Sequence, residues 1–185
     1  MGPPMASVKV VHSRRVHEGK VFDLRVDEIE YPSGRHAIRE VAEHSGGAVA
    51  IPLLDDGTIV LVRQERYPLG QSLLELPAGK LQKGEDPAVC AGRELQEETG
   101  YEARELLPVG SIFTSPGFCT EQLHLFLARG LRESPSGQQL EEGEESLRVE
   151  RVPFEEALAM VKAGTIVDAK TICGILLARE HLQRS

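Results

Sequence analysis

The sequence predicts an α/β protein in which a mixed sheet packs between helices, with a small antiparallel sheet at the N-terminus. Runs of β-branched residues recur along the chain, and a short helix with clear start and stop signals separates them. Two further helical patterns follow near the C-terminus. Strands interleaved with hairpins and helices in this order favour helices on both faces of one mixed sheet.

The N-terminal part reads as three strands. Residues 7–13 and 20–31 are rich in β-branched residues, and the second run alternates apolar and polar positions. A turn at 32–34, Pro-Ser-Gly, precedes a partner strand over 36–44. We therefore expect residues 1–44 to form a β extension and residues 45–185 to form the main domain.

The main domain begins with two strongly apolar runs, 46–54 and 58–67, around Asp-Asp-Gly. We expect a central hairpin that is buried on both faces. The remaining predicted elements are short strands at 73–79, 107–114, 122–129 and 147–152, a polar loop at 133–146, and helices at 154–163 and 169–182, the last capped by Asp168.

Composition narrows the class of protein. The 185 residues are 41% hydrophobic and 27% charged, and no apolar run approaches the roughly 20 residues that span a bilayer. The net charge of −8 argues against nucleic acid as a partner. The three cysteines are too widely spaced to suggest zinc or a disulfide framework. No apolar signal core is visible at the N-terminus, so a cytoplasmic location is the default expectation.

The most informative segment is 79–101, GKLQKGEDPAVCAGRELQEETGY. Asp86 suits a helix N-cap, Pro87 the first helical position and Gly100 the residue after the end. Glu97 and Glu98 fall in the last turn, where the helix dipole disfavours negative charge, and Glu94 shares a face with Glu98. A plain solvated helix does not explain these acids, whereas Mg²⁺ would, since it binds carboxylate and phosphate oxygens together.

This segment resembles the signature of the Nudix hydrolases: Gly, five residues, Glu, seven residues, then Arg-Glu-aliphatic-x-Glu-Glu-x-Gly-bulky. Every fixed position is filled, by Gly79, Glu85, Arg93, Glu94, Leu95, Glu97, Glu98, Gly100 and Tyr101. The resemblance implies an α/β/α sandwich and metal-assisted cleavage of a pyrophosphate. It implies Glu94 and Glu98 as the main metal ligands with Glu97 beside them, the main-chain carbonyl of Ala78 as a further ligand, Arg93 as the residue that orients Glu97, and Glu85 as a support for the loop.

Residues outside the segment resemble the ADP-ribose pyrophosphatase subgroup. Pro116 lies sixteen residues after Gly100, in Ser115-Pro116-Gly117, where that subgroup has its proline. A Pro-Gly turn is also common in ordinary loops. The other positions implied to bind substrate are Glu121, Arg66 on the phosphates, Phe22 on the adenine, and Arg39 and Glu40 from the N-terminal sheet of a second subunit.

The resemblance places the general base on the loop before the last strand, which carries Glu141, Glu142, Glu144 and Glu145. Glu145 falls at the matching position, and Glu144 is the second choice. We expect hydrolysis of ADP-ribose to AMP and ribose 5-phosphate with Mg²⁺ or Mn²⁺, by a homodimer with exchanged N-terminal sheets.

Three alternatives stay open. The same chemistry would serve GDP-mannose, another nucleotide sugar or a dinucleoside polyphosphate. A catalytically silent module that only binds nucleotide is a second reading, and a structural role without ligand is a third. The intact acids Glu94, Glu97 and Glu98 argue against the silent module, which has no need of that costly cluster.

Overall fold

The structure is a computed structural model that describes residues 8–140 and 142–184. Ser7, the first residue of the first predicted strand, and Glu141, one of the loop glutamates, lie outside the described residues. Within the described part, no helix is long and apolar enough to cross a membrane. The chain forms two compact units, residues up to 46 with 113–121, and residues 47–112 with 122 onward.

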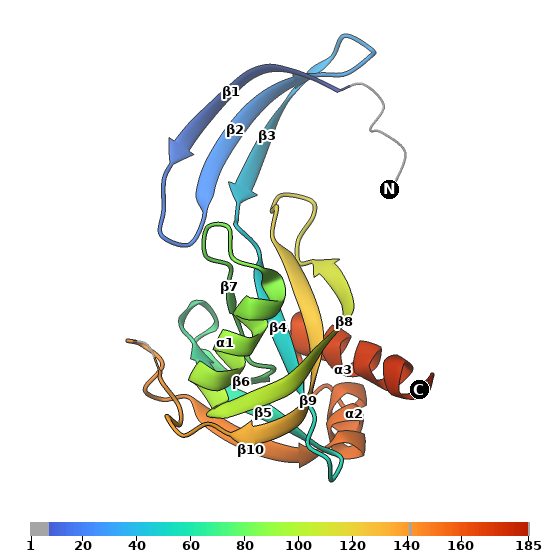
Figure 1. Ribbon diagram of the computed structural model, residues 1–185. Helices are drawn as coiled ribbons and strands as arrows, with labels where there is room; N and C mark the ends of the chain where they lie inside the picture. Colours follow the sequence, from blue (N-terminus) through green and yellow to red (C-terminus); the bar gives the residue numbers. More distant parts are fainter. Residues whose placement is uncertain (1–7, 141, 185) are drawn as a thin grey trace. The chain divides into compact units, whose positions relative to one another are not determined.

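The first unit is a three-stranded antiparallel sheet in the order β1-β2-β3, drawn in blue in Figure 1. Its strands are β1 (Lys9–His17), β2 (Asp23–Glu30) and β3 (His36–Glu43). The three predicted strands are present, although β1 runs to His17 instead of ending at 13. The loop 113–121 joins this unit through a bridge between Ala42 and Cys119.

The second unit contains two sheets and three helices (Figure 1). One sheet has the order β7-β4-β9-β8, with β4 and β9 parallel, and the other has the order β10-β5-β6. The strands are β4 (Gly47–Pro52), β5 (Thr58–Arg66), β6 (Gln71–Glu75), β7 (Ala78–Lys80), β8 (Tyr101–Phe113), β9 (Gln122–Glu133) and β10 (Arg148–Pro153). A short 3₁₀ turn, η1 (Tyr67–Leu69), joins β5 to β6.

The prediction that residues 46–54 and 58–67 pair as a central hairpin is wrong. β4 and β5 are consecutive strands, yet they lie in different sheets and meet only at the bridge between Leu53 and Ile59. β4 pairs with β7 and β9, and β5 pairs with β6 and β10. Each strand is already hydrogen-bonded on both edges, so neither has a free edge for the other. The predicted strand 73–79 is likewise divided into β6 and β7.

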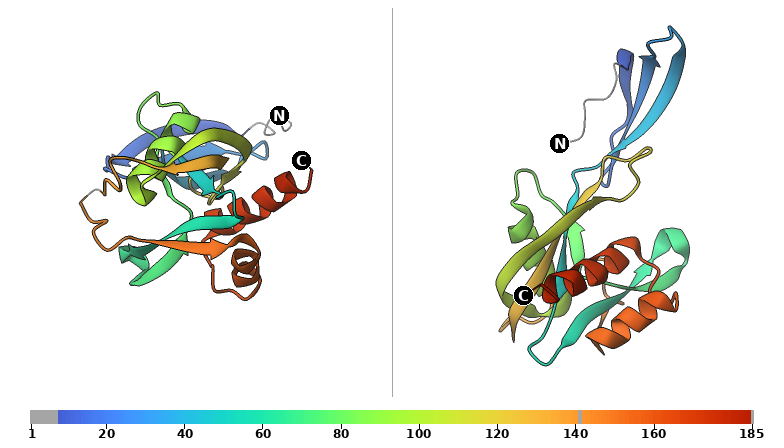
Figure 2. Two further views of the ribbon diagram at one scale, coloured as in Figure 1. Left: turned by 60° about the horizontal axis from the view of Figure 1, so that its bottom comes forward. Right: turned by 90° about the vertical axis from the view of Figure 1, so that its right-hand side faces the viewer.

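The helices begin and end where the sequence indicates. In α1 (Pro87–Thr99) the Asp86 carboxylate accepts hydrogen bonds from the N–H groups of Ala88 and Val89, and Gly100 closes the helix with a positive φ. α2 (Phe154–Lys162) follows Pro153, and Asp168 caps α3 (Ala169–Leu182). α2 and α3 contact each other, and Figure 2 shows them side by side, α2 in orange and α3 in red.

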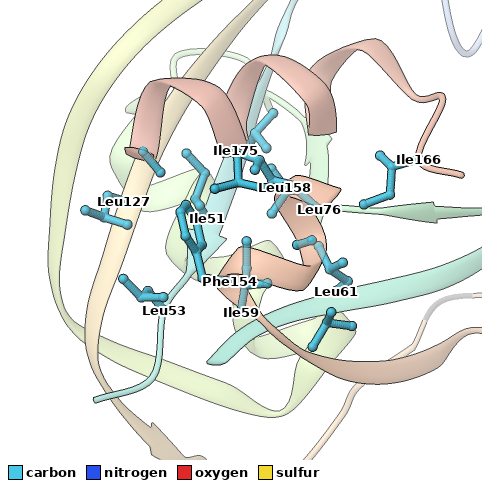
Figure 3. Close-up of a cluster of buried hydrophobic side chains, with 14 of the residues drawn as sticks. Ile51, Leu53, Ile59, Leu61, Leu76, Leu127, Phe154, Leu158, Ile166 and Ile175 are labelled. Carbon is cyan, nitrogen blue, oxygen red and sulfur yellow. The ribbon is translucent and has the colours of Figure 1, made fainter. Parts of the chain in front are cut away.

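The core confirms that β4 is buried on both faces. Ala48 and Ala50 face α1, in a cluster with Cys90 and Leu95. The alternate residues of β4, among them Ile51, face the opposite way into a larger cluster with α2 and α3. Figure 3 shows the larger cluster, where Leu76 lies beside Ile175. α1 on one face and α2 with α3 on the other give the predicted α/β/α arrangement.

The larger cluster should dominate stability. Leu61 on β5 is fully buried, so Leu61→Ala should lower the free energy of unfolding by about 2–5 kcal/mol, since it leaves a cavity. Urea denaturation followed by circular dichroism measures this loss. Val89→Ala, on an exposed face of α1, is the control and should change the value by less than about 0.5 kcal/mol. Equal losses for the two variants would contradict the assignment of the core.

Candidate functional site

Arg93 is the centre of the acid-rich segment. Its guanidinium donates to Glu85 at 3.1 Å and to Glu97 at 2.9 Å, and it forms an ion pair with Glu94 at 2.6 Å. The carboxylates raise the pKa of Arg93, with the hydrogen bond to Glu85 as the largest cause. In return, Arg93 holds the pKa of Glu85 below its ordinary value. One cation thus compensates three acids in one short stretch of chain.

Glu85 also fixes the loop before α1. Its second carboxylate oxygen accepts a hydrogen bond from the Gln82 N–H at 2.9 Å. The Cys90 thiol lies behind this loop, 3.7 Å from the carbonyls of both Gly79 and Lys80. Burial raises the pKa of Cys90 to about 12, so this thiol stays protonated and unreactive near neutral pH. Glu85 therefore connects the loop, through the Gln82 N–H, to α1, through the Arg93 guanidinium.

Gly79 leaves room for the carboxylate of Glu94. A Cβ built on Gly79 would lie 1.9 Å from one carboxylate oxygen of Glu94, so any larger residue would displace that carboxylate. Glu94 and Glu97 line a cavity of about 470 Å³ together with Ala78, Gly79 and Arg93. Burial is the main reason that the pKa of Glu94 is raised. The glycine therefore lets a desolvated carboxylate lie directly against the backbone that leads into α1.

Glu98 is the most buried acid of the segment, with a relative exposure of 3%. One of its carboxylate oxygens has no hydrogen-bond partner, and the Ala78 N–H bonds to the same side chain. Burial, followed by the charges of Glu94 and Glu144, raises its pKa well above the ordinary value. An unpartnered buried carboxylate oxygen costs free energy unless a cation binds it.

These residues fit a hard divalent cation. In the described part of the chain, no three acidic, histidine or cysteine side chains are gathered closely enough to hold a metal as they stand. Glu94 and Glu97 both point to Arg93, which supplies the positive charge that a metal would otherwise bring. Glu98 is bonded to Ala78 and is close in sequence to Glu94. Its orphaned oxygen is a carboxylate donor of the kind that Mg²⁺ prefers.

The loop before β10 is anchored on the end of α1. The last carbonyls of a helix lack partners within the helix. Here Gln139 N–H donates to the Glu97 carbonyl at 2.8 Å, and the Gln138 side chain donates to the Glu98 carbonyl at 2.6 Å. Gln96 returns a hydrogen bond to the Gly137 carbonyl at 2.9 Å. The base of the loop is therefore bonded to the residues that carry the candidate metal ligands.

The loop glutamates differ in where they point. Glu144 lines the cavity with Glu94 and Glu97, and its charge raises the pKa of both Glu94 and Glu98 after the larger effects on each. Glu145, the predicted base, is exposed and accepts a hydrogen bond from the Gly143 N–H at 3.0 Å. Its pKa is lowered by hydrogen bonds from its own backbone and from Gly143. In this conformation Glu144 faces the candidate metal carboxylates and Glu145 bonds to its own loop.

Sequence reasoning missed a buried charge network next to Arg66. Glu75 has a relative exposure of 1% and accepts two hydrogen bonds from Arg66, at 2.7 and 2.6 Å. Lys170 at the start of α3 donates to Oε2 of the same carboxylate, the oxygen that also accepts from Arg66 Nη2. Arg66 lines a second cavity, of about 570 Å³, with Tyr67 and Ser72. The signal that could have found this network is the single acid, Glu75, inside the apolar run LLELPAG.

The other predicted substrate residues belong to the first unit. Phe22 is exposed, and Arg39 and Glu40 are exposed on β3. The Arg39 guanidinium hydrogen-bonds to the Tyr31 hydroxyl and lies over its ring, 5.8 Å from the centroid. In the loop 113–121, the Ser115 carbonyl accepts from the N–H groups of the turn, Pro116 and Gly117 are exposed, and Glu121 accepts from Thr114 at 2.7 Å.

The raised pKa of Glu98 gives the metal-free protein a defined pH dependence. The native protein keeps this proton at pH values where the unfolded chain has lost it, so the free energy of unfolding falls as pH rises from about 4.3 upward. Glu98→Gln removes the cost of the buried charge.

The variant should therefore raise the melting temperature by a few degrees at about pH 8, and have little effect at about pH 4.5. Differential scanning calorimetry in the presence of EDTA measures both values. A change of the same size at both pH values would contradict the raised pKa of Glu98.

Two family models together match nearly the whole described chain. Residues 44–173 match the family model of the NUDIX domain, and residues 8–42 match that of the nucleoside diphosphate sugar hydrolase N-terminal domain. An ADP-ribose pyrophosphatase of Bacillus subtilis is 41% identical over 95% of each chain. A methanol dehydrogenase activator of Bacillus methanolicus is 40% identical over 90% of each chain.

The fold is shared with a solved structure. The crystal structure of an ADP compounds hydrolase superposes with a TM-score of 0.85 over 98% of this chain and 97% of the other, at 19% identity. That identity supports the fold alone. The match to the domain family covers most of the chain and includes every residue of the acid-rich segment. The chain therefore belongs to the Nudix family.

Proposed function

We propose that this chain is a divalent-metal-dependent hydrolase that cleaves the pyrophosphate of ADP-ribose to AMP and ribose 5-phosphate. The buried, unpartnered carboxylate oxygen of Glu98 is the observation that carries the chemistry. Without a cation this oxygen has only a cost, and with one it becomes a ligand. The substrate is supported by the 41% identity to an ADP-ribose pyrophosphatase, which extends over 95% of both chains.

The proposed metal ligands are the Ala78 carbonyl, Glu94 and Glu98, with Glu97 beside them. Mg²⁺ is the proposed ion, with Mn²⁺ as a substitute. When bound, the ion would neutralise charge on the phosphates and acidify a bound water. Arg93 holds Glu97 and Glu85 in place through the bonds described above, so that the acids lie in order before substrate arrives.

The diphosphate is proposed to bind Arg66, because a guanidinium can contact two phosphate oxygens at once. Arg66 is pinned by Glu75 and lines the 570 Å³ cavity, so its direction is set in advance. The proposed contacts from the first unit are Phe22, Arg39, Glu40, Ser115, Pro116, Gly117 and Glu121.

A homodimer with exchanged N-terminal sheets is part of the proposal, with residues 1–44 as the exchanged extension. Large hydrophobic side chains are exposed on and beside this sheet, among them Val10, Phe22 and Ile38, and such side chains are typical of a surface that another chain covers. A cytoplasmic location is proposed from the free cysteines, which are typical of a reducing compartment.

A nucleotide sugar such as GDP-mannose is the second candidate substrate. The match of residues 8–42 to the nucleoside diphosphate sugar hydrolase N-terminal domain favours it. The acid-rich segment handles only metal and pyrophosphate, so both substrates would use the same metal site.

A substrate panel in ¹⁸O-labelled water tests the function. With Mg²⁺, ADP-ribose should give AMP and ribose 5-phosphate, with kcat/KM at least about tenfold above GDP-mannose and above a dinucleoside polyphosphate. Mass spectrometry of the two products shows which phosphorus gains the label. Glu98→Gln is the control and should abolish turnover. Faster turnover of GDP-mannose would transfer the function to the second candidate.

Paired substitutions test the base. Glu145→Gln should lower kcat by about 100-fold or more and leave the Kd for Mn²⁺ unchanged, because a general base acts on the water alone. Glu144→Gln should instead weaken Mn²⁺ binding, because the Glu144 charge lies near Glu94 and Glu98. Steady-state kinetics and calorimetric titration separate the two effects. The reverse pattern would assign the base to Glu144.

A further inference from the structure

The last turn of α1 carries Glu97 and Glu98, and residues 134–139 cross the end of this helix. The Gln138 side chain donates to the Glu98 carbonyl at 2.6 Å, and the Gln139 N–H donates to the Glu97 carbonyl at 2.8 Å. Both carbonyls are among the last of the helix, which have no N–H partner within it. The last turn of α1 contains no basic residue, so neutral amides satisfy this end of the helix beside the candidate metal ligands.

Glycine at position 100 leaves room for the crossing segment. Gly100 has a φ of +74°, and a Cβ built there would lie 3.2 Å from the Gln138 backbone nitrogen. The Gly100 carbonyl accepts a hydrogen bond from the Ser134 N–H at 2.7 Å. Ser134 is buried, and its own carbonyl accepts from the Gly137 N–H at 3.0 Å. The segment is therefore fixed up to Gly137, and Gln138 ties it to α1 where the acidic loop begins.

The far end of the loop is held at the start of β10. Leu147 is buried, and its N–H donates to the Glu144 carbonyl at 2.8 Å. The Arg148 guanidinium donates to the Glu145 carbonyl at 3.0 Å. Glu144 lines the cavity of the candidate metal site. The loop glutamates thus lie between one attachment on α1 and another beside β10.

We propose that Gln138 is a positioning residue: by bonding to the Glu98 carbonyl, it sets the position of the loop glutamate that acts as base relative to the metal site. The inference rests on the proposed function, which places the base on this loop and the metal on α1. A displacement of about 1 Å can lower a rate by a factor of about 100. Gln138 bonds to the backbone of Glu98, so replacing it by a neutral residue leaves every carboxylate of the site in the chain.

Single substitutions measure the size of the effect. Gln138→Met removes the donor at nearly constant volume and should lower kcat about tenfold at saturating Mg²⁺, with the substrate that the panel selects. Gln138→Lys keeps a donor within reach of the carbonyl and should restore kcat to within about threefold of the native value. The matched control is Gln122→Met, which removes an amide that donates to Ser111 Oγ at 3.2 Å between β9 and β8, and should leave kcat unchanged. Melting temperatures within about 4 °C of the native value establish that each variant folds.

A double variant separates positioning from a structural role. Because Gln138 acts through the base, Gln138→Met should lower kcat by less than about twofold once the base has been replaced by Gln. The background is Glu145→Gln, or Glu144→Gln if the paired substitutions assign the base to Glu144. A purely structural role would give the same loss of kcat in both backgrounds, and that result would overturn the proposal.

Hydrogen exchange followed by mass spectrometry tests the attachment without nucleotide. In the full chain, Gln138→Met should speed exchange in peptides that cover residues 142–147 and leave exchange in α3 unchanged. Unchanged exchange in these loop peptides would overturn the proposal. A native protein that cleaves no nucleotide would overturn the proposed function, whereas native turnover with an undiminished kcat for Gln138→Met would overturn this inference alone.

Discussion

The site depends on the ion pairs between the Arg93 guanidinium and the carboxylates around it. Three carboxylates bond to it, and without this cation their mutual repulsion would fall on a single turn of helix and the loop before it. Glu98 lies outside this arrangement and keeps an oxygen without a partner. The segment therefore divides its acids into three that Arg93 compensates and one, Glu98, that is buried with an oxygen that accepts no hydrogen bond.

The packing around β4 holds the acid-bearing helix α1 in place. β4 places small residues, Ala48 and Ala50, toward α1, so the helix packs closely against the sheet, and larger residues face α2 and α3. The segment between β6 and β7 then runs between the ends of α1 and α3. Charged groups on both sides of this segment, Glu98 and Lys170, are buried or nearly so, and their fields are less screened there than at a surface.

Much of this structure could be predicted from the sequence, and the failures have physical causes. The caps of α1 were readable because Asp86 and Gly100 act locally. The hairpin of β4 and β5 was wrong because apolar character shows that a strand is buried but not which strands lie beside it. Glu75 was missed because its meaning depends on Lys170, ninety-five residues away. Motif spacing located Glu98, but only the fold shows that one of its oxygens is unpartnered.

The anchoring of the loop on α1 has a consequence for how sequence change can act on the enzyme. Gln138 and Gln139 bond to the carbonyls of Glu98 and Glu97, so the start of the loop moves as one body with the acids of the helix. Insertions or deletions between this anchor and Leu147 would alter how far the loop glutamates reach while leaving α1 as it is. Loop length is thus a variable that selection could tune separately from the acids on α1.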